Sequence, residues 1–177
     1  GGTPHADNVG PSLLGGVVLL RGYEPLDVVR LPVPERFCCT VAHPAIMVST
    51  REAREVLPRE IPLRSAVSQW GNVGGLVAGL MSGDVELVGR SMRDVVAEPH
   101  RKRFIPGFDS LRDAVLEAGA LAMNISGAGP SVFALSSSME TAARVGEVMK
   151  AHFADRGISS DIYVSKVSNR GARVLND

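Results

Sequence analysis

The sequence predicts an α+β protein in which one antiparallel sheet is covered by helices, close to the split β-α-β (ferredoxin-like) arrangement. Three observations support this prediction. Beyond Pro34 the predicted elements follow the order strand, helices, strand, strand, helix, strand. A glycine loop over residues 125–131 joins two short apolar runs that have the length and composition of buried strands. With 177 residues and 45% hydrophobic side chains, the chain is long enough for one domain, or for one domain plus part of another.

Composition argues against several classes of protein. The 19 basic and 19 acidic residues balance, so we do not expect a nucleic acid as partner. No apolar run approaches the roughly 20 residues of a membrane span, and no basic-then-apolar signal sequence opens the chain. We therefore expect a cytoplasmic protein without a membrane partner.

The cysteines, Cys38 and Cys39, are adjacent in an apolar run. Neighbours on a strand point to opposite faces, so they are poorly placed for a mutual disulfide, and no spaced Cys/His set offers a zinc site. We predict that they are small core residues, with a reactive thiol as the alternative.

The first fourteen residues carry polar side chains suited to a small ligand, among them Thr3, His5, Asp7 and Asn8. If residues 5–14 form a short helix, His5 and Asn8 share one face and could bind one ligand together. The alternative is that Asp7 or Asn8 only caps a helix that begins further on.

Two predicted strands, 15–21 and 26–31, follow and are joined by a turn. Pro32 and Pro34 then interrupt the chain. We place a domain boundary here, with residues 1–35 on one side and residues 36–177 on the other.

A predicted strand over residues 37–42 leads to a short helix that Ser49 or Thr50 caps and Pro58 stops. Arg51 and Arg54 lie near the N-terminal end of this helix, where a cation is unfavourable to the helix dipole unless it binds an external anion. Pairing with Glu55 is the alternative, more so for Arg51.

Further helices and strands follow from periodicity and capping residues. We expect Asp84 and Asp109 to cap two of the helices. The expected ranges are helices 65–82, 85–96, 110–118 and 140–155, strands 121–124 and 132–135 around the glycine loop, and strands 158–167 and 171–175.

Two segments could bind an anion. The basic run Arg101–Arg103 lies between Pro99 and Pro106 and suits a carboxylate or phosphate, although a solvated charged face is the alternative. In the glycine loop, Gly127 and Gly129 allow a ligand to approach the main chain closely. Backbone N–H groups and the hydroxyls of Ser126 or Ser131 could then bind an anionic or zwitterionic ligand, the alternative being an ordinary glycine hairpin.

Taken together, these segments resemble the homoserine kinases, which belong to the GHMP group of small-molecule kinases. The resemblance runs nearly end to end in the family's order. It is carried by residues 5–16 (HADNVGPSLLGG), 49–58 (STREAREVLP), 98–101 (EPHR), 105–108 (IPGF), 125–131 (ISGAGPS) and 171–175 (GARVL).

The resemblance implies a fold, a reaction and a substrate site. Residues 36–177 would form the GHMP-kinase C-terminal domain, and residues 1–35 the end of the N-terminal catalytic domain. The reaction would be ATP-dependent phosphorylation of the L-homoserine hydroxyl, giving O-phosphohomoserine for threonine biosynthesis. His5, Asn8, Arg54 and Arg101 match residues that hold homoserine in the family. The resemblance also suggests a homodimer.

The glycine loop matches the family motif that lies beside the substrate and the nucleotide phosphates. Gly127 would contact substrate, and Ser126 and Gly129 would lie near the phosphates. Asp7 is the carboxylate of its motif that could accept the hydroxyl proton. Mg²⁺ is implied by the ATP chemistry, with no residue assigned to it.

One family motif is missing from the 177 residues: the Gly-Leu-Gly-Ser-Ser-Ala-like loop that opens a helix and binds the ATP phosphates. The chain also begins with Gly and not with Met. We therefore expect a C-terminal part of a kinase, with little or no activity by itself. The alternatives are another GHMP kinase, such as a mevalonate-pathway or sugar kinase, and a non-catalytic ligand-binding or dimerisation module.

Overall fold

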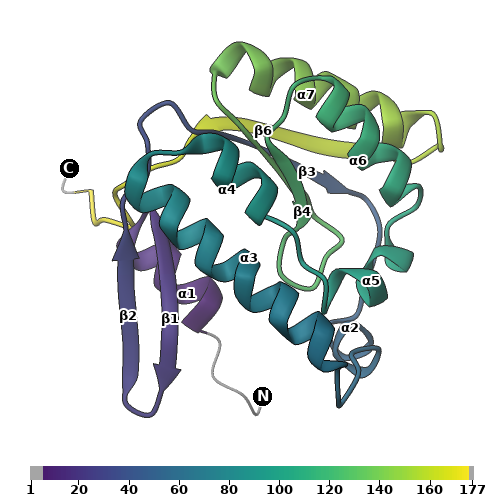
Figure 1. Ribbon diagram of the computed structural model, residues 1–177. Helices are drawn as coiled ribbons and strands as arrows, with labels where there is room; N and C mark the ends of the chain where they lie inside the picture. Colours follow the sequence, from purple (N-terminus) through teal and green to yellow (C-terminus); the bar gives the residue numbers. More distant parts are fainter. Residues whose placement is uncertain (1–5, 176–177) are drawn as a thin grey trace.

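The computed structural model describes residues 6–175, and its main body is a four-stranded antiparallel sheet (Figure 1). The spatial order of the strands is β4-β5-β3-β6. Their bounds are β3 (Cys38–Pro44), β4 (Ala122–Ile125), β5 (Val132–Ser136) and β6 (Ser160–Lys166). With helices between β3 and β4 and one helix between β5 and β6, this topology confirms the predicted split β-α-β arrangement.

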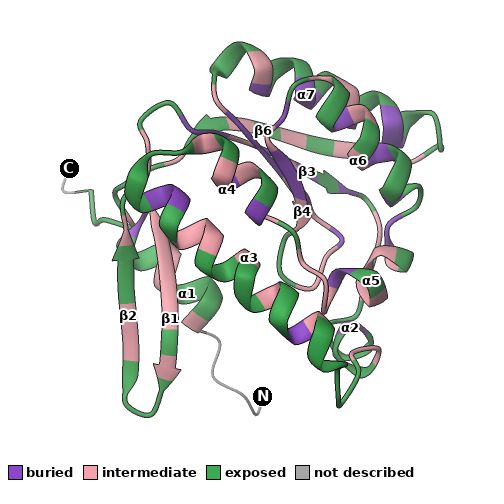
Figure 2. Cartoon of the chain, in the orientation of Figure 1, coloured by how far each residue is buried: buried purple, intermediate pink, exposed green. Residues whose placement is uncertain are grey.

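One face of the sheet packs on helices α6 (Phe108–Glu117) and α7 (Met139–Ala154). The core lies between these layers, where Figure 2 shows buried residues along the inner side of α7 and the central strands. Side chains alternate along β5, and two that face this core, Val132 and Ala134, are fully buried. From the helices, the buried residues are Phe108, Leu111, Val115, Val145, Met149 and Phe153.

Helices α3 (Leu63–Ser82) and α4 (Val85–Ser91) form a second cluster with Phe37 and Leu135. The two helices approach closely because α3 carries Gly79, where a Cβ would lie 2.9 Å from both Cγ2 and N of Val88. A glycine at this position of α3 therefore permits close packing. Asp84 caps α4 as predicted, since its Oδ1 accepts the Leu87 N–H at 2.9 Å.

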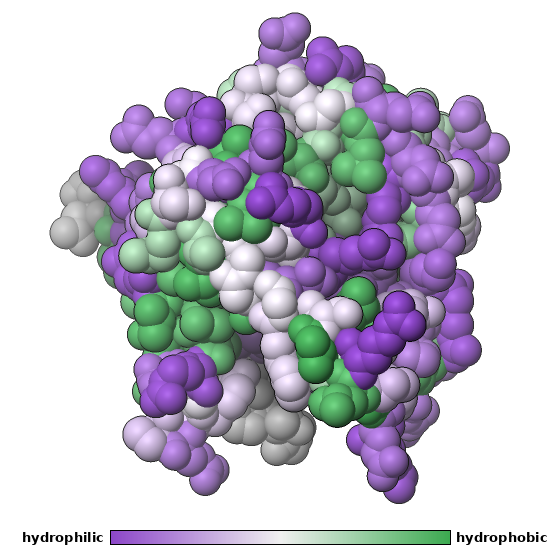
Figure 3. All heavy atoms as spheres, viewed as in Figure 1, coloured by the Kyte–Doolittle hydropathy of each residue, from purple (hydrophilic) through white to green (hydrophobic). Residues whose placement is uncertain are grey.

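Helix α1 (Ala6–Leu14) and a separate two-stranded sheet, β1 (Val17–Tyr23) and β2 (Leu26–Leu31), precede the larger sheet. Half-buried Val17 and Leu31 pack on the cluster of α3 and α4, while hydrophobic surface over the hairpin is exposed (Figure 3). The hairpin is a sheet of its own. The domain boundary at residue 35 stays a prediction.

Residues 168–172 pack against α1 and β1 and do not form the strand predicted over residues 171–175. The Ala172 N–H donates to the Ser12 carbonyl at 2.8 Å, and the Gly16 N–H donates to the Ser168 carbonyl at 2.7 Å. A Cβ on Gly171 would lie 2.0 Å from the Leu13 carbonyl oxygen. The prediction of a strand was wrong because these backbone groups bond to a helix end and not to a sheet edge.

Two further predictions were wrong at helix ends. Helix α4 ends at Ser91 and does not continue to residue 96, because the Asp94 carboxylate accepts the Val96 and Ala97 N–H groups and starts a new turn. Asp109 lies in the first turn of α6 and does not cap it. The N-cap is Gly107, whose φ of 69° is left-handed.

The three short helices that remain are α2 (Thr50–Glu55), α5 (Glu98–Arg101) and the 3₁₀ turn η1 (Lys102–Phe104). Ser49 caps α2 as predicted. Cys38 is buried, and burial, with a smaller effect of Cys38, raises the pKa of the Cys39 thiol to about 11. Both cysteines are free; the prediction of a core residue is confirmed for Cys38, whereas Cys39 is only half-buried. Within residues 6–175, no helix is long and apolar enough to cross a membrane.

Candidate functional site

Four segments that are far apart in the sequence meet around one pocket of about 580 Å³. Helices α1, α2 and α5 and the glycine loop between β4 and β5 each contribute to its wall. The lining residues are Asp7, Asn8, Thr50, Arg54, Arg101, Ser126, Gly127, Ala128 and Gly129. The described residues that match the substrate and phosphate motifs of the resemblance are all among them, namely Asp7, Asn8, Arg54, Arg101, Ser126, Gly127 and Gly129. Arg51, Lys102, Arg103 and Ser131 are not, and His5 lies outside the described residues.

The glycine loop is closed by its own backbone. The Ser126 N–H donates to the Ser131 carbonyl at 2.8 Å, and the Gly129 N–H donates to the Ser126 carbonyl at 3.0 Å. Gly127 has φ of 58° and Gly129 has φ of 85°, both in the left-handed region that favours glycine. A Cβ on Gly127 would meet nothing within 4 Å, so conformation, and not space, requires glycine there.

Two serines flank the loop and differ in their surroundings. Ser126 lines the pocket. The Ser131 hydroxyl lies 2.8 Å from Nδ1 of His43, at the end of β3. Of the two hydroxyls, Ser126 is therefore the one placed to meet a ligand in this pocket.

Arg101 joins two walls of the pocket. Its Nε donates to the Ala53 carbonyl of α2 and its Nη1 donates to the Gly127 carbonyl, each at 3.0 Å. The guanidinium has N–H donors beyond these two, which can bind an anion in its fork geometry. Arg54, the residue after Ala53, brings a second guanidinium to the same pocket.

Arg51 does not line this pocket. Its Nε lies 3.8 Å from the Glu55 carboxylate, and both side chains are largely exposed. Arg51 therefore forms the i,i+4 pair with Glu55 that was the alternative to binding an external anion.

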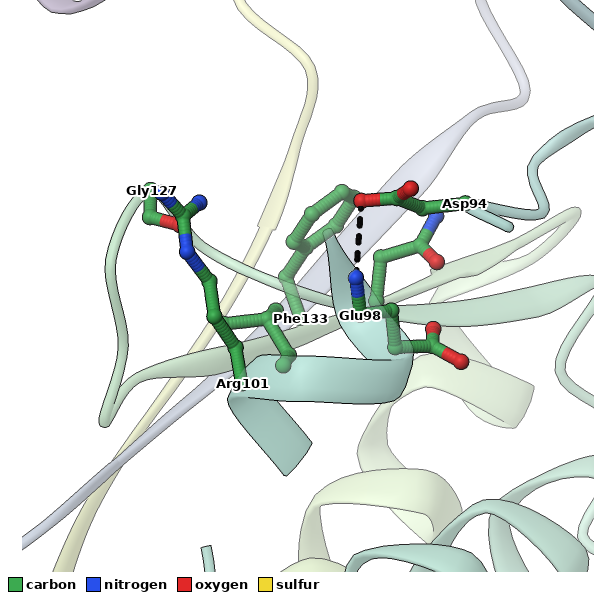
Figure 4. A pocket seen from close by; sticks show the side chains of 7 residues that line it. Asp94, Glu98, Arg101, Gly127 and Phe133 are labelled. Carbon is green, nitrogen blue, oxygen red and sulfur yellow. Dashed lines mark hydrogen bonds between the residues drawn. The ribbon is translucent and has the colours of Figure 1, made fainter. Parts of the chain in front are cut away.

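A second, smaller pocket of about 200 Å³ lies beside the first and shares Arg101 and Gly127 with it. Its other lining residues are Asp94, Glu98, Asn124, Ile125 and Phe133. Figure 4 shows the Arg101 side chain reaching from α5 toward Gly127, with Asp94 and Glu98 on the opposite side. Arg101 therefore lies in the wall common to both pockets.

The described part of the chain contains no group of three or more His, Cys, Asp or Glu side chains that could hold a metal ion. Asp7 is the carboxylate of the larger pocket.

Comparison with known families now assigns the fold. Residues 76–155 match the family model described as GHMP kinases C terminal. The match covers the end of α3 and the elements from α4 to α7, whereas β3 and β6 lie outside it. It agrees with the α+β fold of a GHMP-kinase C-terminal domain that the sequence predicted.

The similarity to individual GHMP proteins extends beyond the domain. The chain is 51% identical over 176 residues to a homoserine kinase of Chlorobium phaeobacteroides, a match that covers 98% of this chain and 55% of that relative. It superposes on the crystal structure of homoserine kinase from Cytophaga hutchinsonii with a TM-score of 0.95 and 55% identity, again over 98% of this chain and 55% of the other. The chain thus spans about half the length of the proteins it matches.

A more distant structure supports the fold alone. Mevalonate kinase of Leishmania major, in complex with R-mevalonate, superposes with a TM-score of 0.71 at 18% identity over 97% of this chain. The chain topology is therefore also found in that structure.

Two parts of the larger pocket, and the smaller pocket as a whole, were missed from the sequence. Thr50 lines it, but the S-T-x-E-A-R segment pointed to a helix cap and to Arg54. Ala53 contributes its carbonyl oxygen to Arg101. No sequence signal marks such an acceptor, because almost every residue carries one. No sequence motif predicted the smaller pocket around Asp94 either.

Proposed function

We propose that this chain supplies the C-terminal domain and one side of the substrate site of a homoserine kinase. The reaction is transfer of the ATP γ-phosphate to the hydroxyl of L-homoserine, giving O-phosphohomoserine for threonine biosynthesis. One observation carries the proposal: Asn8, Arg54, Arg101 and the glycine loop, all parts of the resembling motifs, line a single pocket. The 51% identity to a homoserine kinase supports it.

The chemistry of the pocket suits an amino acid. Homoserine carries a carboxylate, and Arg54 and Arg101 offer two guanidinium groups on one wall. Asn8 lies on another wall and can hydrogen-bond the amino or hydroxyl group. A volume of about 580 Å³ leaves room for a substrate of this size together with a phosphate group.

Phosphoryl transfer depends mainly on positioning and charge neutralisation, so a strong base is not required. We assign Asp7 as the group that can accept the hydroxyl proton. Ser126, Gly127 and Gly129 would lie near the phosphates, where the loop's open backbone around Gly127 can approach them. ATP would supply the phosphoryl group. Mg²⁺ would accompany ATP, and no ligand for it is assigned among the described residues.

The test is homoserine-dependent release of ADP by the complete gene product, beside the 177-residue chain at equal concentration. We expect turnover with homoserine and none with mevalonate or a sugar. Turnover with mevalonate or a sugar, and none with homoserine, would keep the GHMP group and reject the substrate. Robust activity of the 177-residue chain alone would contradict the expectation that its phosphate site is incomplete.

A homodimer and a cytoplasmic location remain expectations of the same proposal. Light scattering coupled to size-exclusion chromatography of the complete product measures the first, and fractionation of cells measures the second.

A further inference from the structure

Arg101 is carried by a helix too short to fix its own orientation. Helix α5 spans Glu98–Arg101, a single turn, and isolated helices of this length are not stable in water. The placement of the Arg101 guanidinium against the Ala53 and Gly127 carbonyls therefore depends on what holds α5 in the fold.

The N-terminal end of α5 is held by Asp94. Its Oδ1 accepts the N–H groups of Val96 and Ala97, each at 2.8 Å, and its Oδ2 accepts the Glu98 N–H at 3.2 Å, the bond drawn in Figure 4. These bonds fix where the turn begins. They hold the start of the turn to the segment before it and make no contact with the core beneath α6.

The second anchor is an ion pair between Glu98 and Arg112 of α6. Arg112 Nη2 donates to Glu98 Oε2, and the side chains are only 8% and 23% exposed for Glu98 and Arg112. The guanidinium of Arg112 also lies 4.7 Å from the ring centre of buried Phe108. A carboxylate this deeply buried needs its partner, so the pair connects α5 firmly to the core beneath α6.

Glu98 and Arg101 occupy the two ends of the same turn and point in different directions. Figure 4 shows the Glu98 carboxylate directed away from the Arg101 guanidinium, which extends toward Gly127. We propose that the buried Glu98–Arg112 pair positions Arg101 in the substrate pocket. Both members are then positioning residues for substrate binding, an inference whose kinetic part rests on the proposed function.

The test uses a double substitution in the complete gene product. A single substitution leaves a buried charge unpaired and risks unfolding, whereas apolar replacement of both partners is often tolerated. In Glu98→Leu/Arg112→Met we expect the KM for homoserine to rise roughly 10-fold or more, because a displaced binding group costs affinity. The KM for ATP should stay within about twofold of the parent, since Arg101 is assigned to the carboxylate.

The matched control is Glu140→Leu/Arg144→Met. This Glu–Arg pair lies on α7 with an Arg144 Nη1 to Glu140 Oε1 distance of 3.9 Å and is exposed. The same two substitutions there should leave both KM values unchanged. A comparable rise in the homoserine KM of the control would overturn the proposal, because it would show an unspecific effect of the substitutions.

A second measurement reads the position of Arg101 without any turnover. The Arg101 Nε–H, bonded to Ala53, should give a slowly exchanging ¹⁵N NMR signal, which is identified by its loss in Arg101→Lys. In the folded double variant we expect this signal to exchange faster. Unchanged protection of the Arg101 Nε–H would overturn the proposal that the Glu98–Arg112 pair positions Arg101. Faster exchange with an unchanged homoserine KM would overturn the proposal that the pair affects substrate binding.

The two measurements separate the two proposals. If the parent protein turns over no homoserine, the proposed function fails, and the exchange of the Arg101 Nε–H still decides whether the Glu98–Arg112 pair positions this side chain.

Discussion

Arg101 binds the carbonyl of Ala53 with one nitrogen and the carbonyl of Gly127 with another, both at 3.0 Å. It therefore ties α2 to the glycine loop and fixes the backbone directly before Arg54. The two arginines of the pocket are therefore not independent. Arg101 helps to hold Arg54 in place through its hydrogen bond to the Ala53 carbonyl. This dependence shapes what substitution of each should do.

Arg54→Ala should raise the homoserine KM roughly 10- to 100-fold in the complete gene product and leave the ATP KM almost unchanged, because a charge-assisted bond to the carboxylate is lost. Arg101→Ala should raise it further, since it also frees α2 and the loop. Steady-state kinetics with each substrate varied measures both. Equal effects on the two KM values would argue against carboxylate binding.

Gly127→Ala should destabilise the protein by about 1 kcal/mol, because φ of 58° disfavours any residue with a Cβ. The control is Gly74→Ala in α3, where a Cβ also meets nothing within 4 Å but the backbone is helical. That change should stabilise by about 0.5–1 kcal/mol. Urea unfolding of both variants gives the comparison, and the same sign in both would contradict the role assigned to φ.

Gly171→Ala should cost at least about 2 kcal/mol, because its Cβ would overlap the Leu13 carbonyl at 2.0 Å and backbone must move. We also expect a higher homoserine KM, since α1 carries Asn8. Gly22→Ala is the control, because the atom nearest its Cβ is the Pro25 carbonyl oxygen at an ordinary 3.8 Å. Thermal unfolding and kinetics of the two variants test the prediction, which fails if they behave alike.

Stability should decrease as the pH falls below about 6.5, in part because of His152. Burial is the main cause that lowers the pKa of His152 from 6.5, and nearby Arg156 adds to it against the opposing effects of the Pro106 carbonyl and Asp155. In this pH range the unfolded chain binds the proton more readily than the folded one, so acid favours unfolding. His152→Gln should flatten the pH dependence of the free energy of unfolding between pH 7 and the lowered pKa. An equally steep dependence in the variant would exclude His152 as its source.

Local signals predicted most of the secondary structure. The helical spacing of apolar residues predicted α3, and Asp84 was predicted as the N-cap of α4, where its carboxylate indeed accepts a backbone N–H. One local signal was misread: the Asp94 carboxylate accepts the N–H groups of Val96 and Ala97, two and three residues further on, and so ends one helical segment and starts the next. Other predictions failed where a distant partner decides. Gly171 reads as part of a strand and instead contacts the end of α1.

The pocket was foreseeable to the extent that it is made of motif side chains. The chemistry of three side chains, Asn8, Arg54 and Arg101, suits an amino acid as ligand. The family resemblance predicted that these three residues share one site. The Ala53 carbonyl and the Glu98–Arg112 pair were not foreseeable, because backbone acceptors carry no sequence signature and ion pairs between separate helices depend on packing.

The contact of residues 168–172 with the opening segments bears on the order of events during protein synthesis. Arg30 donates to the Asn169 carbonyl across 139 positions of the chain. Helix α1 and the hairpin leave the ribosome long before their partner segment has been made, and contacts of such long sequence separation form slowly. The wall that carries Asp7 and Asn8 is therefore completed late, only after translation has passed residue 172.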